Sequence, residues 1–302
     1  MRQNKRMATV LVALATVVAL VAGCGGGAKS GKVTIGSKDF SENILLGEMV
    51  AQVIEGNTEI KVERKLNLGG TKVNFDGLKS GDLDMYVDYD GTAYSVHLGH
   101  TEPITDAGKV YDQVKQEFES KFKLTWSRPF GFNNTYALAM PRKLAEQYNI
   151  KTYSDLAQHS DKFVFGTTNE FMGRKVDGYD PLVKTYGYKF KDVKKMTAGL
   201  RYKALEQNEI QVMDAYATDG KLKEFDMVIL QDDKKFFPPY NGAVVVRMET
   251  LEKNPGLLDV LNKLGGTMND QVMQELNYRV EVKGEAVEAV AKEFLKSKGL
   301  VN

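Results

Sequence analysis

Residues 32–56, KVTIGSKDFSENILLGEMVAQVIEG, contain the pattern that decides the fold. The first five residues form a short strand pattern ending at Gly36, and Ser41 then has the character of a helix N-cap. Apolar residues recur behind it at helical spacing, until Gly56 and Asn57 stop the run: Leu45, Leu46, Met49, Val50, Val53 and Ile54. The stretch predicts a strand followed directly by a helix.

The same alternation continues along the chain. Residues 60–68 alternate as a strand, a helix is expected from about residues 69–71 to 79–81, and residues 83–87 read as a third strand. Alternating strands and helices predict an α/β lobe with a largely parallel sheet. Such sheets bind ligands in the crevice beyond the carboxyl ends of their strands.

A second series of strands and helices follows the first. Strands are expected at residues 135–140, 163–166, 212–216, 227–230 and 243–246, and two closing helices at residues 269–278 and 285–298. No Pro/Ser-rich linker separates two domains. We therefore expect two lobes joined by crossing segments near residues 130–135 and 236–242, one lobe formed by residues 32–134 plus 241–302 and the other by 135–240. Closure about such a hinge traps ligands.

The amino terminus reads as an export signal. Three basic residues precede a short apolar run, and small residues lead to Cys24, the only cysteine. This pattern resembles a bacterial lipoprotein signal over residues 1–23, with a lipidated Cys24 and a flexible tether over residues 24–31. The alternative is an ordinary signal peptide with a leftover thiol.

The composition is that of a globular protein. Of 302 residues, 42% are hydrophobic and 27% charged, and the formal net charge is +1. Residues 1–23 hold three basic side chains and no acidic one, so the remaining chain has a net charge of −2. A nucleic-acid binder would show a clear basic excess, so this class of partner is not expected. With one cysteine, no disulfide is expected.

Catalytic and metal-binding patterns are absent from the sequence. Residues 82–91 invite a calcium-loop interpretation, but the best register places Tyr86 and His97 at the two positions that need acids. His97 and His100 could share a helix face, yet no third zinc ligand is near. We therefore expect no metal, no cofactor and no enzyme. An enzyme would have to draw on the remaining close carboxylates, Asp88, Asp90, Asp214 and Asp219.

Four tyrosines stand at strand ends beside glycine, asparagine or proline: Tyr89, Tyr136, Tyr216 and Tyr240. A quaternary ammonium has no N–H to donate, so proteins hold it with the faces of aromatic rings. A tyrosine cage for such a cation is one interpretation of this pattern. The other is that each ring simply caps the core.

Several motifs make the chain similar to a known family. They are VTIGSKDFSE at residues 33–42, LGGT at 68–71, YVDYDGT at 86–92, GFNNTYA at 131–137, and Gly173-Arg174 ahead of Asp177-Gly178. Over about residues 32–300 the chain resembles the substrate-binding lipoproteins of bacterial quaternary-amine ABC importers. The resemblance implies a two-lobe periplasmic-binding-protein-like fold of type II, with the ligand in the cleft between the lobes.

The resemblance also implies roles for particular residues. The cage that holds the trimethylammonium group falls on Tyr89, Tyr136, Tyr216 and Tyr240. Arg174 matches an arginine that pairs with the ligand carboxylate, and its alternative is an ion pair within the protein. Thr92 matches a position where threonine accompanies a broad substrate range.

Further polar contacts are expected around the ligand. Asn134 is placed for a polar contact, and Lys38 and Ser41 are candidates for the carboxylate end, as is Asn43. A solvated turn lysine is the alternative for Lys38. Trp126 is expected in core or hinge packing rather than in the cage.

The function expected from the resemblance is solute capture. The protein would bind glycine betaine, carnitine, proline betaine or choline and deliver it to an ABC permease with its ATPase. It would act as a monomer, lipid-anchored to the outer face of the cytoplasmic membrane. The alternatives are a binding protein for ergothioneine or another trimethylated amino acid, a sensor that binds without transport, and an exported enzyme on a similar scaffold.

Overall fold

A computed structural model describes residues 31–102, 104 and 106–302. Residues Lys32–Asn302 form one compact unit. The expected signal sequence, Cys24 and the tether up to residue 30 lie outside the described residues. Within the described part of the chain, no helix is both long and apolar enough to cross a membrane.

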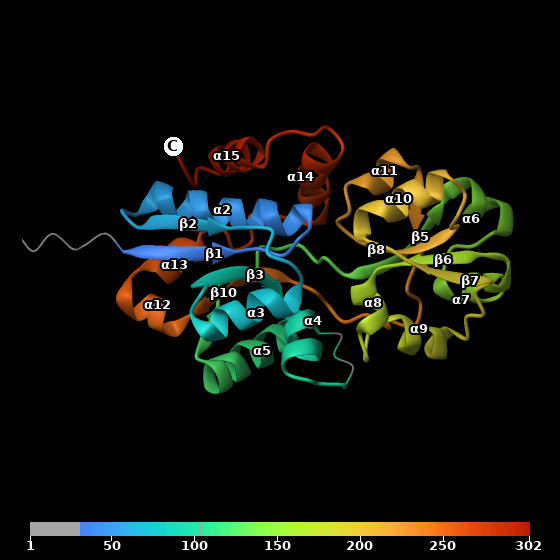
Figure 1. Cartoon of the computed structure of the whole chain (residues 1–302), viewed down its shortest axis with the longest axis horizontal. Helices are drawn as coiled ribbons and strands as arrows, with labels where there is room; N and C mark the ends of the chain where they lie inside the picture. Colours follow the sequence, from blue (N-terminus) through green and yellow to red (C-terminus); the bar gives the residue numbers. More distant parts are fainter. Residues whose placement is uncertain (1–30, 103, 105) are drawn as a thin grey trace, which may run out of the picture. The chain divides into compact units, whose positions relative to one another are not determined.

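The first sheet has five strands in the order β2-β1-β3-β10-β4 (Figure 1). Strands β1 and β2 are parallel, as are β1 and β3, while β10 runs antiparallel to both β3 and β4. The strands are β1 (Lys32–Gly36), β2 (Lys61–Lys65), β3 (Met85–Tyr89), β4 (Leu124–Trp126) and β10 (Gly242–Arg247). This sheet and its helices are called the first lobe.

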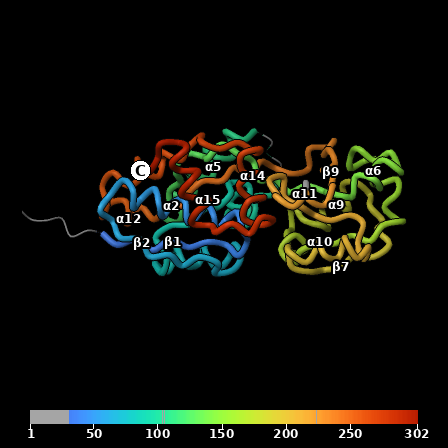
Figure 2. The backbone as a smooth tube through the Cα atoms, turned by 90° about the horizontal axis from the view of Figure 1, so that it is seen from above, coloured from blue at the N-terminus to red at the C-terminus, as the bar shows by residue number. Residues whose placement is uncertain are grey.

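Both ends of the chain supply helices to the first lobe. They are α2 (Ser41–Asn57), α3 (Thr71–Ser80), α4 (Asp90–Thr92), the π-helix η1 (Ala93–His97), α5 (Ala107–Phe122), α12 (Met248–Lys253), α13 (Leu257–Asn262), α14 (Asp270–Glu281) and α15 (Val287–Ser297). Figures 1 and 2 show α15 beside α2. The amide of Gln52 on α2 donates to the carbonyl of Glu288 over 3.0 Å. The C-terminal segment therefore covers the helix that begins the fold.

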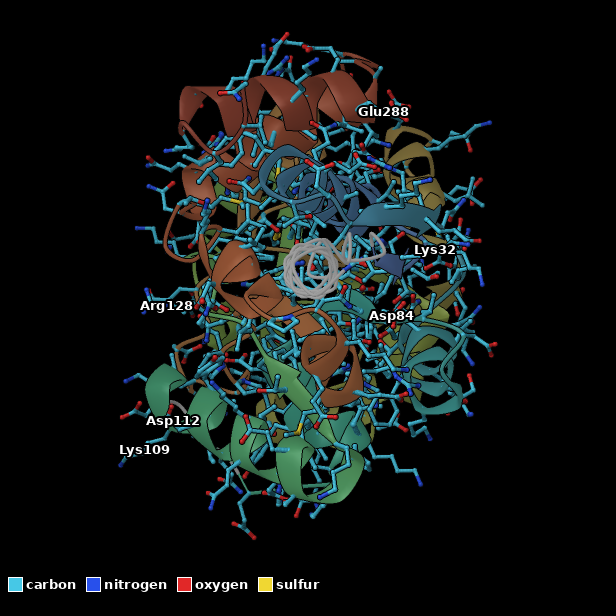
Figure 3. The ribbon with its side chains drawn as sticks, turned by 90° about the vertical axis from the view of Figure 1, so that its left-hand side faces the viewer. Lys32, Asp84, Lys109, Asp112, Arg128 and Glu288 are labelled. Atoms are coloured by element: carbon cyan, nitrogen blue, oxygen red, sulfur yellow. The ribbon has the colours of Figure 1, made fainter. Side chains whose placement is uncertain are left out.

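Helix α5 shows how an amphipathic helix packs on this lobe. Its side chains Val110, Val114 and Phe118 are fully buried. Lys109 and Asp112 are exposed and point away from the molecule in Figure 3. Burial of one face stabilises a helix whose polar face stays in water.

The second sheet has the order β7-β6-β8-β5-β9. It repeats the pattern of the first sheet, because β6 is parallel to β7 and β8 while β5 is antiparallel to its two neighbours. The strands are β5 (Tyr136–Pro141), β6 (Val164–Thr167), β7 (Asp192–Lys195), β8 (Val212–Tyr216) and β9 (Met227–Ile229). Its helices are α6 (Arg142–Tyr148), α7 (Tyr153–Ala157), the 3₁₀ turn η2 (Ser160–Lys162), α8 (Asn169–Gly173), α9 (Tyr179–Tyr186), α10 (Ala198–Glu206) and α11 (Lys221–Glu224).

The prediction of two α/β lobes is confirmed, and the differences are local. Ser41 is the first helical residue and not the N-cap; Phe40 holds that position, without a side-chain cap. The side chain of Asn43 instead anchors the first turn of α2. It accepts a hydrogen bond from Lys38 N at 2.6 Å and donates one to Val87 O at 3.0 Å. The strand expected at residues 60–68 is shorter and ends at Lys65.

Two segments connect the sheets, residues 127–135 and 230–241. They lie against each other, because Asn134 N donates to Tyr240 O over 3.0 Å and Tyr240 N donates to the side chain of Asn133 over 2.7 Å. Each segment runs directly into the antiparallel strand of the sheet it enters. Trp126 precedes the first segment; it is fully buried and packs on Phe118 with ring centroids 5.3 Å apart, as core packing predicts.

Gly131 offers a direct test of the first connecting segment. Its φ of +108° is unfavourable for other residues, and a Cβ there would lie 2.4 Å from Met268 O. We expect Gly131→Ala to lower the free energy of unfolding by about 2 kcal/mol or more, from backbone strain and steric clash. Urea denaturation measures this. Gly199→Ala on α10 is the control, because nothing lies within 4 Å of its added Cβ; an equal loss in both variants would contradict the argument.

Candidate ligand-binding site

Three of the four tyrosines of the expected cage stand at strand ends in the two sheets, and the fourth stands just before a strand. Tyr89 is the last residue of β3 and pairs with Gly242, the first residue of β10. Tyr216 is the last residue of β8 and pairs with Tyr136, the first residue of β5. Tyr240 stands two residues before β10. Each ring thus lies where a parallel strand ends and an antiparallel strand begins.

Tyr136 is the centre of the aromatic cluster. Its ring centroid lies 5.1 Å from that of Tyr216 and 5.7 Å from that of Tyr240, the latter edge to face. Tyr89 joins the cluster through Phe40, whose ring stacks on Tyr89 at 6.3 Å and on Tyr216 at 5.9 Å. The structure therefore brings the four tyrosines into one cluster. Phe40 is a fifth member that was not predicted as a site residue.

The tyrosines of this cluster are neutral. Burial raises the pKa of Tyr89, Tyr136 and Tyr240 well above the usual value, and it also raises the pKa of Tyr216. Neutral rings present π faces of negative potential at little desolvation cost. Such faces attract cations that carry no hydrogen-bond donors.

Arg174 lies against this cluster. Its guanidinium carbon is 5.2 Å from the ring centroid of Tyr136 and 5.6 Å from that of Tyr240. The side chain forks onto Asp177, with Nε 2.7 Å from Oδ1 and Nη2 2.5 Å from Oδ2. Nη2 also donates to the hydroxyls of Tyr240 and Ser95 at 3.1 Å each. Among the described residues, its buried Nη1 has no hydrogen-bond partner.

Lys38 lies beneath the cluster in a buried ion pair. Its ammonium is 2.7 Å from Asp88 Oδ1, and the two side chains are 5% and 0% exposed. It also stands 5.1 Å from the ring centroid of Tyr89. The alternative of a solvated turn lysine is wrong. The contacts of Lys38 orient Asp88 and Tyr89, so its charge is already matched within the protein.

Thr92 is buried at the end of α4, close to Tyr89 in the chain. The preceding Asp90 ties α4 to the second connecting segment, because its carboxylate accepts from Asn241 N at 2.7 Å and from Asn241 Nδ2 at 2.8 Å. Gly91 is required there, since a Cβ would lie 2.3 Å from Pro239 O. These contacts fix the backbone that carries Tyr89 and Thr92.

Glu42 is a further residue that sequence reasoning missed. Its fully buried carboxylate accepts four side-chain hydrogen bonds at 2.5–2.8 Å, from Tyr89, Asn134, Thr218 and Asn277. Burial raises its pKa, and these hydrogen bonds oppose the shift. Hydrogen bonds donated to the carboxylate favour its negatively charged form. It joins the start of α2 to Thr218, which follows β8 of the second lobe.

A cavity of about 310 Å³ borders this network. Phe40 and Tyr216 form part of its aromatic wall, and Asn134, Asn277 and Glu281 contribute polar groups. The cavity thus adjoins the aromatic cluster on one side and the Glu42 network on the other. Of the predicted ligand-binding residues, Ser41, Asn134 and Tyr216 line it directly.

Glu281, the last residue of α14, has a carboxyl group with a raised pKa. Burial raises its pKa to about 8, together with the nearby carboxylates of Asp219 and Glu42. Lys221 and the hydrogen bond with Ser41 lower the pKa and only partly offset this rise. The native state therefore keeps a proton that the unfolded chain releases near pH 4.5. The stability from this proton is complete below about pH 4.5 and is lost as the pH rises through about 8.

Replacing Glu281 by glutamine removes this dependence, because the amide stays neutral. We expect Glu281→Gln to raise the free energy of unfolding relative to the wild type by a few kcal/mol at pH 9 and by little at pH 5. Urea denaturation at both pH values measures the difference. The exposed Glu275→Gln on the same helix is the control; an equal effect of Glu281→Gln at both pH values would contradict the assignment.

The remaining titratable residues considered in the sequence analysis contact other side chains of the protein. His97 contacts Asp88 at 3.1 Å and His100 contacts Glu117 at 2.6 Å, so the two histidines do not face a common point. Asp214 pairs with Arg201 at 2.6 Å. In the part of the chain that the structure describes, no three His, Cys, Asp or Glu side chains gather as a metal site would require.

Comparison with known proteins adds to this geometry. A family model described as the substrate-binding domain of the ABC-type glycine betaine transport system, OpuAC, matches residues 31–297. A solved structure described as a glycine betaine/carnitine/choline ABC transporter is 36% identical, with a TM-score of 0.76. The match covers 89% of this chain and 100% of that chain.

Two curated relatives differ in the ligand that their names give. The ergothioneine transport permease/ergothioneine binding protein EgtU of Helicobacter pylori (strain G27) is 39% identical over 89% of this chain and 48% of its own length. The carnitine transport binding protein OpuCC of Listeria monocytogenes serotype 1/2a (strain 10403S) is 36% identical over 89% of this chain and 88% of its own length. The chain thus spans about half of the first relative and most of the second.

Proposed function

Because the chain belongs to the OpuAC family of substrate-binding domains of ABC-type glycine betaine transport systems, we propose that it captures a quaternary-ammonium solute in the cage formed by Tyr89, Tyr136, Tyr216 and Tyr240. Glycine betaine, carnitine, proline betaine and choline share the required methylated cation. The protein then delivers the solute to an ABC permease and its ATPase.

The observation that carries this proposal is the convergence of four tyrosines from both lobes. Tyr89 comes from the first sheet and Tyr136 and Tyr216 from the second, while Tyr240 lies on the segment between them. All are neutral; Tyr89, Tyr136 and Tyr240 are buried and Tyr216 is half-buried. In such a place a cation–π contact contributes up to about 2 kcal/mol. Rings from both lobes also make ligand binding favour lobe closure.

Arg174 supports a carboxylate-bearing ligand. Its buried Nη1 has no hydrogen-bond partner among the described residues and lies 4.0 Å from Glu170 Oε1, on a guanidinium that faces Tyr136 and Tyr240. A carboxylate next to a trimethylammonium group would accept from it. This favours zwitterionic betaines over choline, which has no carboxylate. Asn134 and Thr92 complete the ligand surroundings in this proposal, and the matched charge of Lys38 gives it a supporting role.

The proposed setting is outside the cell membrane. Residues 1–23 direct export, Cys24 carries the lipid, and residues 24–31 tether a monomeric binding unit to the outer face of the cytoplasmic membrane. In the binding unit, residues 32–134 and 241–302 form one lobe and residues 135–240 the other, a division supported by the membership of the two sheets. A lipid anchor keeps the unit close to its permease.

Ligand-dependent melting tests the proposal. The purified full chain in detergent is heated with glycine betaine, carnitine, proline betaine, choline or unmethylated glycine. A ligand that binds only the folded state raises the melting temperature. We expect shifts with the three betaines, a smaller one with choline and none with glycine. The absence of a shift with every methylated amine, ergothioneine included, would refute the cage.

A further inference from the structure

The two lobes contact each other directly at several places. Arg174 Nη2 of the second lobe donates to Ser95 Oγ of the first at 3.1 Å, and Thr71 Oγ1 of the first donates to Glu170 Oε1 of the second at 3.1 Å. The first contact belongs to the surroundings of the cage, and the Glu170 side chain is 42% exposed. A third set of contacts lies outside the cage, between α14 and the loop that follows β8.

This loop, residues 217–220, is tied to α14 by two side chains of that helix. Gln274 Nε2 donates to Ala217 O at 2.7 Å, and Asn277 Nδ2 donates to Thr218 O at 2.8 Å. Helix α14 itself packs on α2 of the first lobe. Because the loop belongs to the second lobe, these two hydrogen bonds join the lobes and would break if the lobes moved apart.

The carboxylate of Glu42 takes part in the same contact. Thr218 Oγ1 donates to its Oε2 at 2.5 Å, so a side chain of the second lobe reaches a buried anion of the first. Of its other donors, Tyr89 and Asn277 stand in the first lobe and Asn134 in the connecting segment. Movement of the second lobe away from α2 would therefore remove one partner of this charge. Removing a partner from a buried ionised group is costly, because the charge has already lost its water.

The loop and the helix are also packed closely at Gly220. A Cβ on this residue would lie 2.4 Å from Tyr278 N and 2.7 Å from Asn277 C, both of them backbone atoms that cannot turn aside. Only glycine lets the loop approach α14 to this distance. The contact between the lobes is therefore sensitive to a single methyl group.

The contact is connected to the cage in both lobes. The hydroxyl of Tyr89 donates to Glu42 Oε1 at 2.6 Å, and Thr218 follows Tyr216 by two residues. A ligand held by rings of both lobes cannot leave until the lobes separate. Contacts that oppose their separation therefore slow the release of the ligand.

We propose that Glu42 and Thr218 are the two sides of a latch that holds the second lobe closed over the cage, in the empty protein as well as in the loaded one. The latch also includes Gln274, Asn277 and Gly220. Glu42 is a positioning residue in it, because its carboxylate fixes the loop of the second lobe and needs no contact with the ligand. The inference rests on the proposed function for its ligand, but closure of the empty chain is measurable without one.

Removal of one hydroxyl tests the latch. Thr218→Val keeps the shape of the side chain but loses the hydrogen bond to Glu42. Stopped-flow fluorescence on the full chain in detergent is expected to show at least about tenfold faster dissociation of glycine betaine, because a hydrogen bond to a buried charge is lost. The association rate should not fall, because separated lobes admit the ligand. Thr218→Ser keeps the hydroxyl and should retain the wild-type dissociation rate.

A matched threonine separates the latch from general destabilisation. Thr250 is buried within the first lobe and donates to Asp84 Oδ1 at 2.5 Å, the same distance as between Thr218 and Glu42. Thr250→Val should therefore lower the free energy of unfolding in urea about as much as Thr218→Val does. It should leave the dissociation rate of glycine betaine unchanged, because it removes no contact between the lobes.

A methyl group at Gly220 opens the latch in a second way. Gly220→Ala removes no hydrogen bond, but its Cβ pushes the loop away from α14. Dissociation of glycine betaine should become at least about fivefold faster, as overpacking of a close contact predicts. Gly199→Ala in the same lobe is the control and should keep the wild-type rate, because nothing lies within 4 Å of its added Cβ.

The empty protein gives a readout that needs no ligand. Small-angle neutron scattering with contrast-matched detergent measures the radius of gyration of the full chain. This radius should be larger for Thr218→Val and Gly220→Ala than for the wild type and the control variants. A Thr218→Val variant that matched the wild type in dissociation rate or in this radius would overturn the latch and leave the cage intact. If no betaine binds, the proposed function is refuted, and the radius alone decides on the latch.

Discussion

The Tyr136→Leu variant is expected to bind trimethylammonium ligands about a hundredfold more weakly than the wild type. Tyr136 contacts Tyr216 and Tyr240, so leucine removes one π face and also the ring that holds two others in place. A desolvated cation–π contact contributes about 2 kcal/mol, and poorer placement of the two neighbouring rings brings the loss to about 2.7 kcal/mol, a factor of about a hundred. Titration calorimetry with glycine betaine measures the change.

Two further variants make the result specific to the ring face. Tyr136→Phe keeps the face and is expected to stay within about threefold of the wild-type affinity. Tyr148→Leu removes a tyrosine from α6 in the same lobe, where it packs on Phe163 away from the cage, and it should leave binding unchanged. If Tyr136→Phe lost as much affinity as Tyr136→Leu, the hydroxyl and not the π face would be responsible.

Arg174→Met is expected to have two separable effects. It leaves the buried Asp177 carboxylate without its cation, which should lower the free energy of unfolding by about 3 kcal/mol. It also removes the donor proposed for the ligand carboxylate. Glycine betaine should therefore lose at least tenfold more affinity than choline. Urea denaturation measures the first effect and calorimetry with the two ligands the second.

The double variant Arg174→Met/Asp177→Asn separates stability from selectivity. Removing both charges takes away the uncompensated carboxylate, while an asparagine oxygen still accepts from Tyr240, whose hydroxyl donates to Asp177 in the wild type. Much of the stability should return, but the preference for glycine betaine should not. Recovery of that preference would show that Arg174 acts on the ligand only through the fold.

The sequence predicts those strands and helices in which apolar residues recur at the spacing of the element. Residues 32–57 predict β1 and α2 because the apolar residues that recur there are the ones that become buried. The edge strand β7, with the sequence DVKK, has no apolar alternation and was not predicted. Charged residues suit an exposed edge, where they discourage pairing with other chains.

The cage residues were predictable because each tyrosine stands beside a turn signal at a strand end. The Glu42 network was not, because its partners are 47 to 235 residues away in the chain. The burial of Lys38 could not be predicted for the same reason. Its position in a turn predicts exposure, but its ammonium pairs with Asp88 of β3. Long-range pairing of this kind leaves no local pattern.

The order of strands in the first sheet also bears on how the chain acquires its structure. Strand β10 lies between β3 and β4, yet it follows all five strands of the second sheet in the chain. As synthesis proceeds, residues 32–126 have no partner for the exposed edges of β3 and β4 until residue 247 has emerged. The second sheet is formed by one continuous stretch and can fold first. The first sheet is therefore completed only late in synthesis, a delay that suits the export proposed for this chain.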